Sequence, residues 1–356
     1  MARDTARIGV GSASARRRGC HARGPVLADA VMKAIRVHAA GGASALSFED
    51  AADPVPGADD VVVKVEAAGV NFVDVYHRNG HYKLKTPFTP GSEASGRVVA
   101  LGSSVGGVAI GDRVAYTGVL GAYAELARVP ASRVVKVPDG LTAKQAAAAM
   151  MQGLTAHYLA TSTFPLAKGD PCVVHAAAGG VGLLLCQVAK LRGAVVIATV
   201  STAEKAELAR GAGADHVILY TSQPFEAEVK RLTGGVGAKV IYDGVGKTTF
   251  EKDLECLAPR GLLALFGQSS GPVAPFEPTV LAAKGSLYLT RPTLGDFIAS
   301  REELVARTAD VFAWIRDGKV HLRIAHEFAL ADAAAAHEAL EGRKTTGKVL
   351  LLPDGA

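Results

Sequence analysis

The feature that most constrains the fold of this chain is a regular alternation of apolar, strand-like segments with helix-like segments after residue 170. Six segments have the composition of strands: 172–177, 194–200, 216–220, 238–243, 261–267 and 286–290. Between the first five lie helix-like segments near 181–192, 203–211, 224–233 and 247–257. Apolar strands that alternate with helices predict a parallel sheet covered on both faces. Six such strands are enough for a complete doubly wound sheet of the Rossmann type, an α/β fold.

The first strand-to-helix turn of this sheet carries a glycine-rich loop within HAAAGGVGLLLCQVAK, residues 175–190. The amino end of a helix attracts a pyrophosphate, because its N–H groups are unpaired and the helix dipole is positive there. Gly179 and Gly180 would let the backbone approach the phosphates, and Gly182 would let the helix pack closely on the strand. Ala177 replaces the first glycine of the usual G-x-G-x-x-G, so we expect a somewhat different turn. A tight turn without a ligand could use the same glycines, but the alternating strands and helices favour a dinucleotide site.

The end of the second strand indicates which dinucleotide would bind. An NAD site usually has Asp or Glu there, which binds the ribose 2′-hydroxyl. Here the strand AVVIATV is followed by Ser201, and no acid stands at its tip. A 2′-phosphate needs hydrogen-bond donors and positive charge, which Ser201 and Lys205 can supply, and Tyr220 can add a hydroxyl. Lys205 alone could be an ordinary solvated helix residue. With the acid missing, the pattern predicts NADPH as the cofactor.

A β-rich region precedes this sheet. Residues 32–140 contain short β-branched runs bounded by Gly and Pro, such as VVVKVEAAGV at 61–70, and little helical pattern. They predict a barrel-like domain. Residues 141–160 then have a helical pattern, with Thr142 as the expected N-cap. A last helix and strand over residues 331–352 are expected to return to the β-rich domain.

Residues 1–31 show neither helical nor strand periodicity and are rich in Ala, Arg, Gly and Ser. An Arg-rich segment with few acids could be a transit-like leader. We favour a disordered N-terminal extension, because MKAIRVHAAG from Met32 is itself typical of a first strand and turn.

Charge and cysteine usage limit the partners. The formal net charge is +5, but residues 1–31 hold six Arg and two Asp and so carry +4 of it. The nearly neutral remainder argues against a nucleic-acid partner. No apolar run approaches the ~18 residues that span a bilayer, so we expect no membrane partner. The four cysteines are far apart and form no C-x-x-C pair, which fits a reducing compartment, and we expect a cytoplasmic protein.

Several long motifs now point to a family. They are GVNFVDVYHRNGHY (69–82), PGSEASGRV (90–98), GLTAHYL (153–159), HAAAGGVGLL (175–184), FGQSSG (266–271), GSLYLTRP (285–292) and EGRKTTGK (341–348). From Met32 onward the chain resembles the zinc-free, zeta-crystallin-like quinone oxidoreductases of the medium-chain dehydrogenase/reductase superfamily. The resemblance implies a GroES-like domain over 32–153 and 293–356, and a Rossmann NADPH-binding domain over 154–292. It also implies a homodimer, in which GSLYLT could pair edge to edge with its copy unless the chain's own C-terminal segment covers that edge.

The resemblance also implies which residues contact the nicotinamide, the pyrophosphate and the 2′-phosphate of the cofactor, and which residue closes over it. In chain order the implied residues are Asn71, Thr155, Gly179, Gly180, Val181, Ser201, Lys205, Tyr220, Phe266, Gly267, Ser269 and Arg343. Gln268 stands where close relatives often have Asn, which could alter a side-chain contact.

The zinc alcohol dehydrogenases of this superfamily carry G-H-E-x-x-G, with His as a metal ligand. Here the stretch is GSEASG, and Ser92 replaces that His. Zn²⁺ needs three or four N, S or O ligands in a tight cluster, and the sequence offers no such spacing. We therefore expect no metal.

The expected chemistry is hydride or electron transfer from NADPH to a quinone or another small electrophilic acceptor, with the protein supplying orientation. Tyr76 and Tyr82 are candidate hydroxyl donors to the quinone oxygen, although either could simply pack at the domain edge. The alternative is NADPH-dependent reduction of an activated C=C bond in 2-alkenals or enoyl thioesters, with the tyrosine at Tyr82 as proton donor. A third possibility, of another class, is the RNA-binding or structural role reported for some animal relatives.

Overall fold

The computed structural model describes residues 31–354, which belong to one compact unit. The extension predicted over 1–31 lies outside the described residues, except for Val31, the first residue of β1 (Val31–Val37). Because the described residues form a single compact unit, the domain boundaries at residues 153 and 292 stay a prediction. None of the helices within 31–354 is long and apolar enough to cross a bilayer.

A six-stranded parallel sheet confirms the predicted doubly wound fold. Its strands, in spatial order, are β10 (His216–Leu219), β9 (Val195–Val200), β8 (Pro171–Val174), β11 (Ala238–Asp243), β12 (Leu257–Leu265) and β13 (Tyr288–Thr290). From β8 the chain adds β9 and β10 on one side and then β11, β12 and β13 on the other, so the strand order reverses between β8 and β11. In such sheets ligands bind beyond the carboxyl ends of the strands at this reversal.

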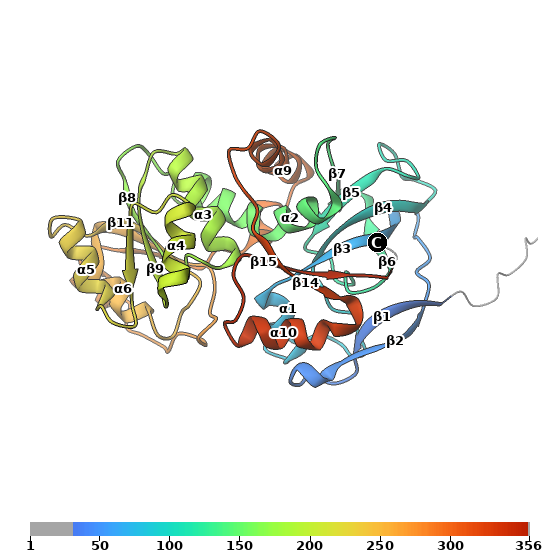
Figure 1. Ribbon diagram of the computed structural model, residues 1–356, viewed down its shortest axis with the longest axis horizontal. Coiled ribbons are helices and arrows are strands. Elements are labelled where there is room, and N and C mark those ends of the chain that lie inside the picture. Colours follow the sequence, from blue (N-terminus) through green and yellow to red (C-terminus); the bar gives the residue numbers. More distant parts are fainter. Residues whose placement is uncertain (1–30, 355–356) are drawn as a thin grey trace, which may run out of the picture. The chain divides into compact units, whose positions relative to one another are not determined.

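Helices cover both faces of this sheet, as expected (Figure 1). On one face lie α3 (Gly180–Leu191) and α4 (Ala203–Gly211), and on the other lie α5 (Phe225–Leu232) and α6 (Phe250–Cys256). Neighbouring residues of one strand point to opposite faces, so Val174 packs in the first apolar cluster and Val173 in the second. Both faces are therefore buried, which explains why the strands are apolar throughout.

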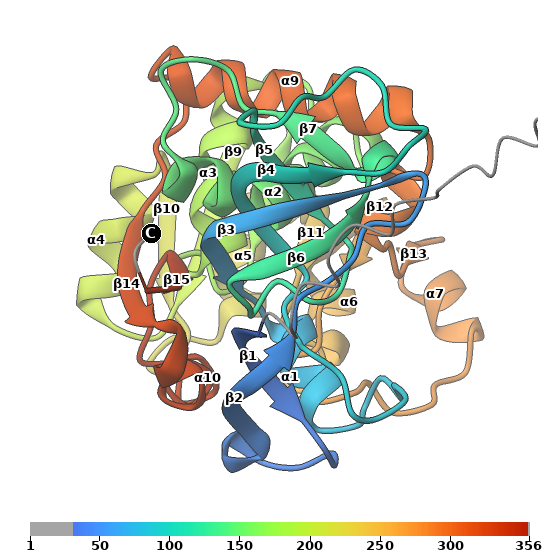
Figure 2. The ribbon, with the colours of Figure 1, turned by 90° about the vertical axis from the view of Figure 1, so that its right-hand side faces the viewer.

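The β-rich region forms a seven-stranded sheet (Figure 2). Its strands are β3 (Asp60–Val70), β4 (Glu93–Leu101), β5 (Arg113–Thr117), β6 (Leu126–Pro130), β7 (Val134–Lys136), β14 (Ile324–Ala329) and β15 (Lys348–Leu352). The C-terminal strand β15 pairs antiparallel with β3. This pairing puts Val349 opposite Val70, and so brings the preceding residue, Lys348, to Asn71. A separate antiparallel pair is formed by β1 and β2 (Leu46–Ala52).

Helix α2 (Ala143–Tyr158) contacts α3 of the parallel sheet and β3, β4 and β5 of the other sheet. It begins where predicted, because the Thr142 hydroxyl accepts from the Gln145 backbone N–H. Helix α7 (Thr279–Ala283) lies between β12 and β13, and three further helices follow β13: α8 (Leu294–Phe297), α9 (Arg301–Arg316) and α10 (Ala333–Glu341).

Helix α1 (Phe72–Arg78) is not predicted by the sequence pattern. It has only seven residues, which is too short to show a clear helical period. It is stabilised by its cap, because the backbone N–H of Asn71 donates to the Asp74 carboxylate at 2.9 Å. This short helix carries Asn71 at its start and Tyr76 near its end.

Candidate active site

The glycine loop after β8 turns at Ala176, which has a positive φ of 48°. The backbone N–H of Gly179 donates to the Ala176 carbonyl at 2.8 Å, and α3 starts directly after Gly179. A left-handed conformation is uncommon for alanine, so the loop makes its turn one residue before the missing glycine at Ala177. Strand β8 consequently ends at Val174, three residues earlier than the pattern predicts.

Gly180 and Gly182 have different neighbours. A Cβ on Gly182 would lie 2.5 Å from the Ala176 carbonyl oxygen and 2.7 Å from the Ala177 Cα, so glycine lets α3 pack on the turn. A Cβ on Gly180 would collide with the side-chain amide of Gln152, which comes from α2. The loop is therefore a tight cradle at the start of α3 whose exposed N–H groups fit a pyrophosphate.

The residues predicted for the 2′-phosphate gather at the ends of β9 and β10. The Tyr220 N–H donates to the Val200 carbonyl at 3.1 Å, so Tyr220 lies beside the residue that precedes Ser201. Lys205, in the first turn of α4, donates through Nζ to the backbone carbonyl of Arg343 at 3.1 Å. Ser201, Tyr220, Lys205 and the backbone of Arg343 thus lie at one corner of the sheet, which we call the phosphate corner. This arrangement fits a phosphate group.

The loop after β12 carries Phe266, Gly267 and Ser269, and it packs on the loop after β11. The N–H groups of Phe266 and Gly267 donate to the Asp243 carbonyl at 2.8 and 3.2 Å, and Ser269 N–H donates to the Gly244 carbonyl at 3.1 Å. Sequence reasoning missed the loop after β11. Its signal is the buried Asp243 followed by GVG at the carboxyl end of β11, next to the sheet reversal.

Asn71 is buried, and its side chain has three partners. Its Nδ2 donates to Glu93 Oε1 at 2.6 Å, and its Oδ1 accepts from Gln152 Nε2 at 3.2 Å and from Lys348 Nζ at 3.0 Å. Thr155 lies about one turn beyond Gln152 on α2 and is also buried. Glu93, Gln152 and Lys348 were not predicted. For Glu93 and Lys348, the signal in the sequence is a charged residue in an otherwise buried strand.

Behind Asn71 a buried chain of polar groups runs through the β-rich region. Burial raises the pKa of Asp74 to about 7, although it accepts from Ser92 Oγ at 2.8 Å. Tyr123 donates to Asp74 at 3.2 Å and contacts His337 Nε2 at 3.2 Å. Arg78 has only donors, so His337 accepts from it at Nδ1 and carries its hydrogen on Nε2. Burial, and then the Arg78 charge, lower the pKa of His337 to about 3, which keeps it neutral.

The two candidate donors lie together. The rings of Tyr76 and Tyr82 meet edge to face with centroids 5.4 Å apart. Burial raises the pKa of Tyr76 to about 12 despite a hydrogen bond from the Gln268 backbone, so its hydroxyl stays protonated at neutral pH. Tyr82 is 39% exposed. His81 contacts the Gln268 side chain, which joins this aromatic group to the loop after β12.

The structure brings the predicted residues to one region, at the carboxyl ends of β8, β9, β11 and β12 and the adjoining start of α1. Gln152 links the glycine loop to Asn71, because its side chain lies against Gly180 and donates to Asn71 Oδ1. The role of each residue as a ligand or donor stays a prediction. His175, interpreted as a strand residue behind the loop, is buried and bonds to Thr199 Oγ1 and Asp253 Oδ1, both at 2.7 Å.

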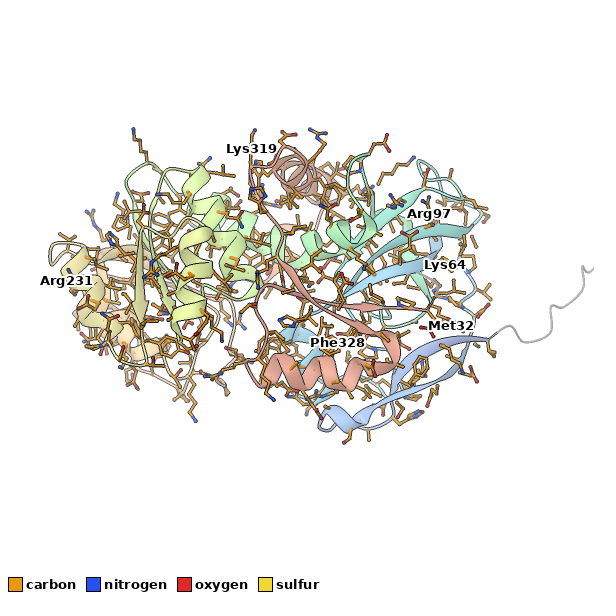
Figure 3. All side chains as sticks on the ribbon, in the orientation of Figure 1. Met32, Lys64, Arg97, Arg231, Lys319 and Phe328 are labelled. Atoms are coloured by element: carbon orange, nitrogen blue, oxygen red, sulfur yellow. The ribbon has the colours of Figure 1, made fainter. Side chains whose placement is uncertain are left out.

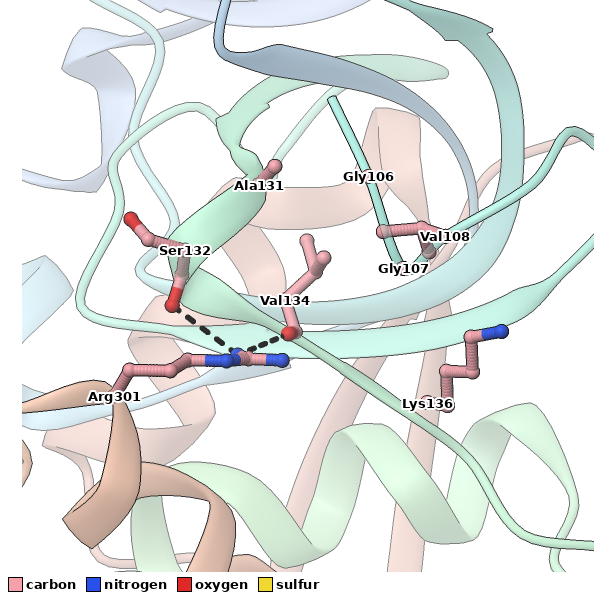
Figure 4. Close-up of a pocket in the computed structure, with 8 residues that line it drawn as sticks. All are labelled: Gly106, Gly107, Val108, Ala131, Ser132, Val134, Lys136 and Arg301. Carbon is pink, nitrogen blue, oxygen red and sulfur yellow. Dashed lines mark hydrogen bonds between the residues drawn. The ribbon is translucent and has the colours of Figure 1, made fainter. Parts of the chain in front are cut away.

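A pocket of about 240 Å³ lies elsewhere, where Arg301 at the start of α9 meets β7 and the loop at 106–108 (Figure 4). The Arg301 guanidinium already donates to the Ser132 carbonyl at 3.1 Å, and Lys136 pairs with Asp112 at 2.8 Å. None of the predicted site residues lines this pocket. It is therefore separate from the candidate active site.

The chain is similar to known proteins over most of its length. The alcohol dehydrogenase GroES-like domain family matches residues 57–139, and the zinc-binding dehydrogenase family matches residues 180–309. A quinone oxidoreductase of Pseudomonas aeruginosa is 46% identical over 90% of this chain and 99% of its own length. A 2-haloacrylate reductase of a Burkholderia species is 39% identical over 91% of this chain and 99% of its own length. The crystal structure of Escherichia coli quinone oxidoreductase complexed with NADPH has a TM-score of 0.89 and 40% identity, covering 90% of this chain and all of that one.

Proposed function

Because this chain belongs to the quinone oxidoreductase family of the medium-chain dehydrogenase/reductase superfamily, we propose that it reduces quinones with NADPH at the site described above. The observation that carries the proposal is the phosphate corner, where Lys205 contacts the Arg343 backbone near Ser201 and Tyr220, and where no acid ends β9. That corner lies beside the glycine cradle, and Gln152 connects the cradle to Asn71. NADPH supplies the hydride when bound. The chain's residues hold and orient it.

We propose that the transfer needs no zinc, although one matching family is described as zinc-binding. The donors do not fit the metal: Ser92 donates to Asp74, and within residues 31–354 no three His, Cys, Asp or Glu side chains are grouped to hold an ion. A quinone spreads incoming charge over two carbonyls, so a Lewis acid is not required. Incubation with EDTA should leave the rate unchanged, and inhibition that added Zn²⁺ reverses would contradict this proposal.

The function is tested by measuring NADPH and NADH oxidation against a panel of acceptors. We expect NADPH to be oxidised faster than NADH with 1,4-benzoquinone and 1,2-naphthoquinone. The C=C alternative is supported by the similarity to a 2-haloacrylate reductase, so the panel includes a 2-haloacrylate, a 2-alkenal and an enoyl thioester. Higher kcat/KM with one of these than with every quinone would favour the alternative. No oxidation with any acceptor would refute both.

We predict that one of the two tyrosines donates a hydrogen bond or proton to the acceptor. Changing that residue to Phe should lower kcat with 1,4-benzoquinone by about tenfold or more, since general acid catalysis contributes roughly 10²–10⁴-fold in typical enzymes. Steady-state rates of Tyr76→Phe and Tyr82→Phe would identify it. Tyr288→Phe, at an exposed residue on β13, is the control. If both variants keep the wild-type kcat, the two tyrosines only pack.

We also propose a homodimer formed through β13. This strand is at the edge of the parallel sheet, and Tyr288 on it is 60% exposed. An unpaired edge can add the same strand of a second copy. Light scattering should give twice the chain mass for the wild type and a smaller mass for Tyr288→Lys, because like charges would face each other. A monomeric wild type would disprove the dimer.

A cytoplasmic location stays a prediction, and so does the absence of a nucleic-acid partner. Lys64 and Arg97 are cross-strand neighbours on β3 and β4, but the exposed Arg231 on α5 and Lys319 after α9 lie on other parts of the structure (Figure 3). This spread does not favour RNA binding. Salt-dependent retention of residues 32–356 on immobilised RNA would revive that alternative.

A further inference from the structure

A buried ion pair lies beside the candidate active site. Glu93 on β4 and Lys348 on β15 are 0% and 2% exposed, and Lys348 Nζ contacts Glu93 Oε1. Buried ion pairs are poor stabilisers, because desolvation can cost more than their attraction returns. The backbone also makes room for this one: a Cβ on Gly69 would lie 2.7 Å from Lys348 Nζ and would collide with the Glu93 carboxylate. Stability alone is therefore a weak reason for the pair.

The polar atoms of the pair converge on the Asn71 amide. Glu93 Oε1 accepts from Asn71 Nδ2 at 2.6 Å, and Lys348 Nζ donates to Asn71 Oδ1 at 3.0 Å. A reversed amide would place its NH₂ against the ammonium and its oxygen against the carboxylate. The pair therefore excludes the flipped orientation. Glu93 takes one hydrogen of the Asn71 NH₂, and across residues 31–354 no acceptor is found for the second.

The same groups are connected to the glycine cradle. Gln152, the third partner of Asn71, lies against Gly180. Lys348 directly follows Gly347, which pairs with Gly179 in a parallel bridge and donates to the Ala178 carbonyl at 3.2 Å. The ion pair and the cradle therefore share one rigid connection. Asn71 is thereby oriented relative to the loop that would take the pyrophosphate.

We propose that Lys348 and Glu93 are positioning residues for hydride transfer, which lock the Asn71 amide so that its free N–H faces the nicotinamide. This inference rests on the proposed function, which places Asn71 beside the nicotinamide of NADPH. The pair acts through Asn71 and does not itself contact the cofactor. Losing either charge should therefore slow the reaction in NADPH-saturated enzyme while leaving NADPH affinity nearly unchanged, because the phosphate contacts are elsewhere.

The test is a double-mutant cycle between Lys348→Met and Asn71→Ala in the full chain. We expect Lys348→Met alone to lower kcat with NADPH and 1,4-benzoquinone by about tenfold or more. In the Asn71→Ala background the same change should alter kcat less than twofold, because the group it positions is gone. The Kd for NADPH, from the fluorescence of the bound nicotinamide, should stay within about threefold. Lys64→Met, an exposed lysine on β3, is the matched control and should change nothing.

Lys348→Met could unfold the chain by leaving Glu93 buried without its partner. The double variant Glu93→Gln/Lys348→Met removes both charges, and we expect it to fold and still to have a kcat about fivefold or more below wild type. Equal loss in the wild-type and Asn71→Ala backgrounds would show a purely structural role and overturn the inference. So would wild-type kcat in folded Lys348→Met or in the folded double variant. Failure of the wild-type protein to oxidise NADPH with any acceptor of the panel would instead refute the proposed function.

Discussion

Gly182→Ala is expected to lower the free energy of unfolding by about 2–4 kcal/mol, the range of a strong overpacking defect. The added Cβ would lie 2.5 Å from the Ala176 carbonyl oxygen and 2.7 Å from the Ala177 Cα, and backbone atoms cannot rotate away. Either α3 or the turn must move. Because the same turn forms the pyrophosphate cradle, NADPH binding should weaken by about a hundredfold or more in the folded fraction. Urea unfolding and NADPH titration measure the two effects.

Gly211→Ala is the control for this change. Gly211 ends α4, and a Cβ there would meet no atom within 4 Å. Alanine is the better helix former, so this variant should be neutral or more stable by up to about 1 kcal/mol. If Gly182→Ala were as stable as wild type and bound NADPH normally, the close packing of α3 on the turn would be wrong.

Lys205→Ala is expected to raise the KM for NADPH by about ten- to a hundredfold, since a hydrogen bond to a charged group contributes roughly 1.5–3 kcal/mol. The KM for NADH should change less than twofold, because NADH lacks the 2′-phosphate. Lys205 is held at the phosphate corner by the Arg343 carbonyl, 3.1 Å from Nζ. Initial rates with both cofactors at saturating quinone measure the effect.

Lys252→Ala is the matched control, because Lys252 is an exposed lysine on α6, on the opposite face of the sheet from α4. It should leave both KM values unchanged. Equal KM increases for NADPH and NADH in Lys205→Ala would mean that Lys205 does not bind the 2′-phosphate. The choice of NADPH would then need another explanation, with Arg343 as the next candidate.

The parallel sheet was predictable because its information is local. Each strand is an apolar run buried on both faces, and each helix follows it directly, so the alternation is visible in the sequence. The Thr142 cap and the acid-free end of β9 are also local. The prediction failed where the backbone departs from regular structure. Ala176 takes a left-handed conformation that nothing in its residue type requires, and α1 is too short to show periodicity.

The network around Asn71 could not be predicted from sequence. Its partners Glu93, Gln152 and Lys348 are 22, 81 and 277 residues away from it. A single buried charge in a strand has no visible partner in the sequence, because pairing depends on which strands become neighbours. Only the antiparallel pairing of β15 with β3 brings Lys348 to Asn71. Asp243 was missed for a similar reason, since its importance comes from the loop that packs on it.

The sequence by itself determined the six-stranded sheet, the position of the dinucleotide loop and the residues at the phosphate corner, because period, composition and strand ends are properties of short segments. The tertiary structure alone decided how the Asn71 amide is oriented, that the turn is made at Ala176, and that Ser92 donates a hydrogen bond to Asp74. Each of these depends on groups that meet only after distant segments pack, and burial then makes an unpaired polar group costly.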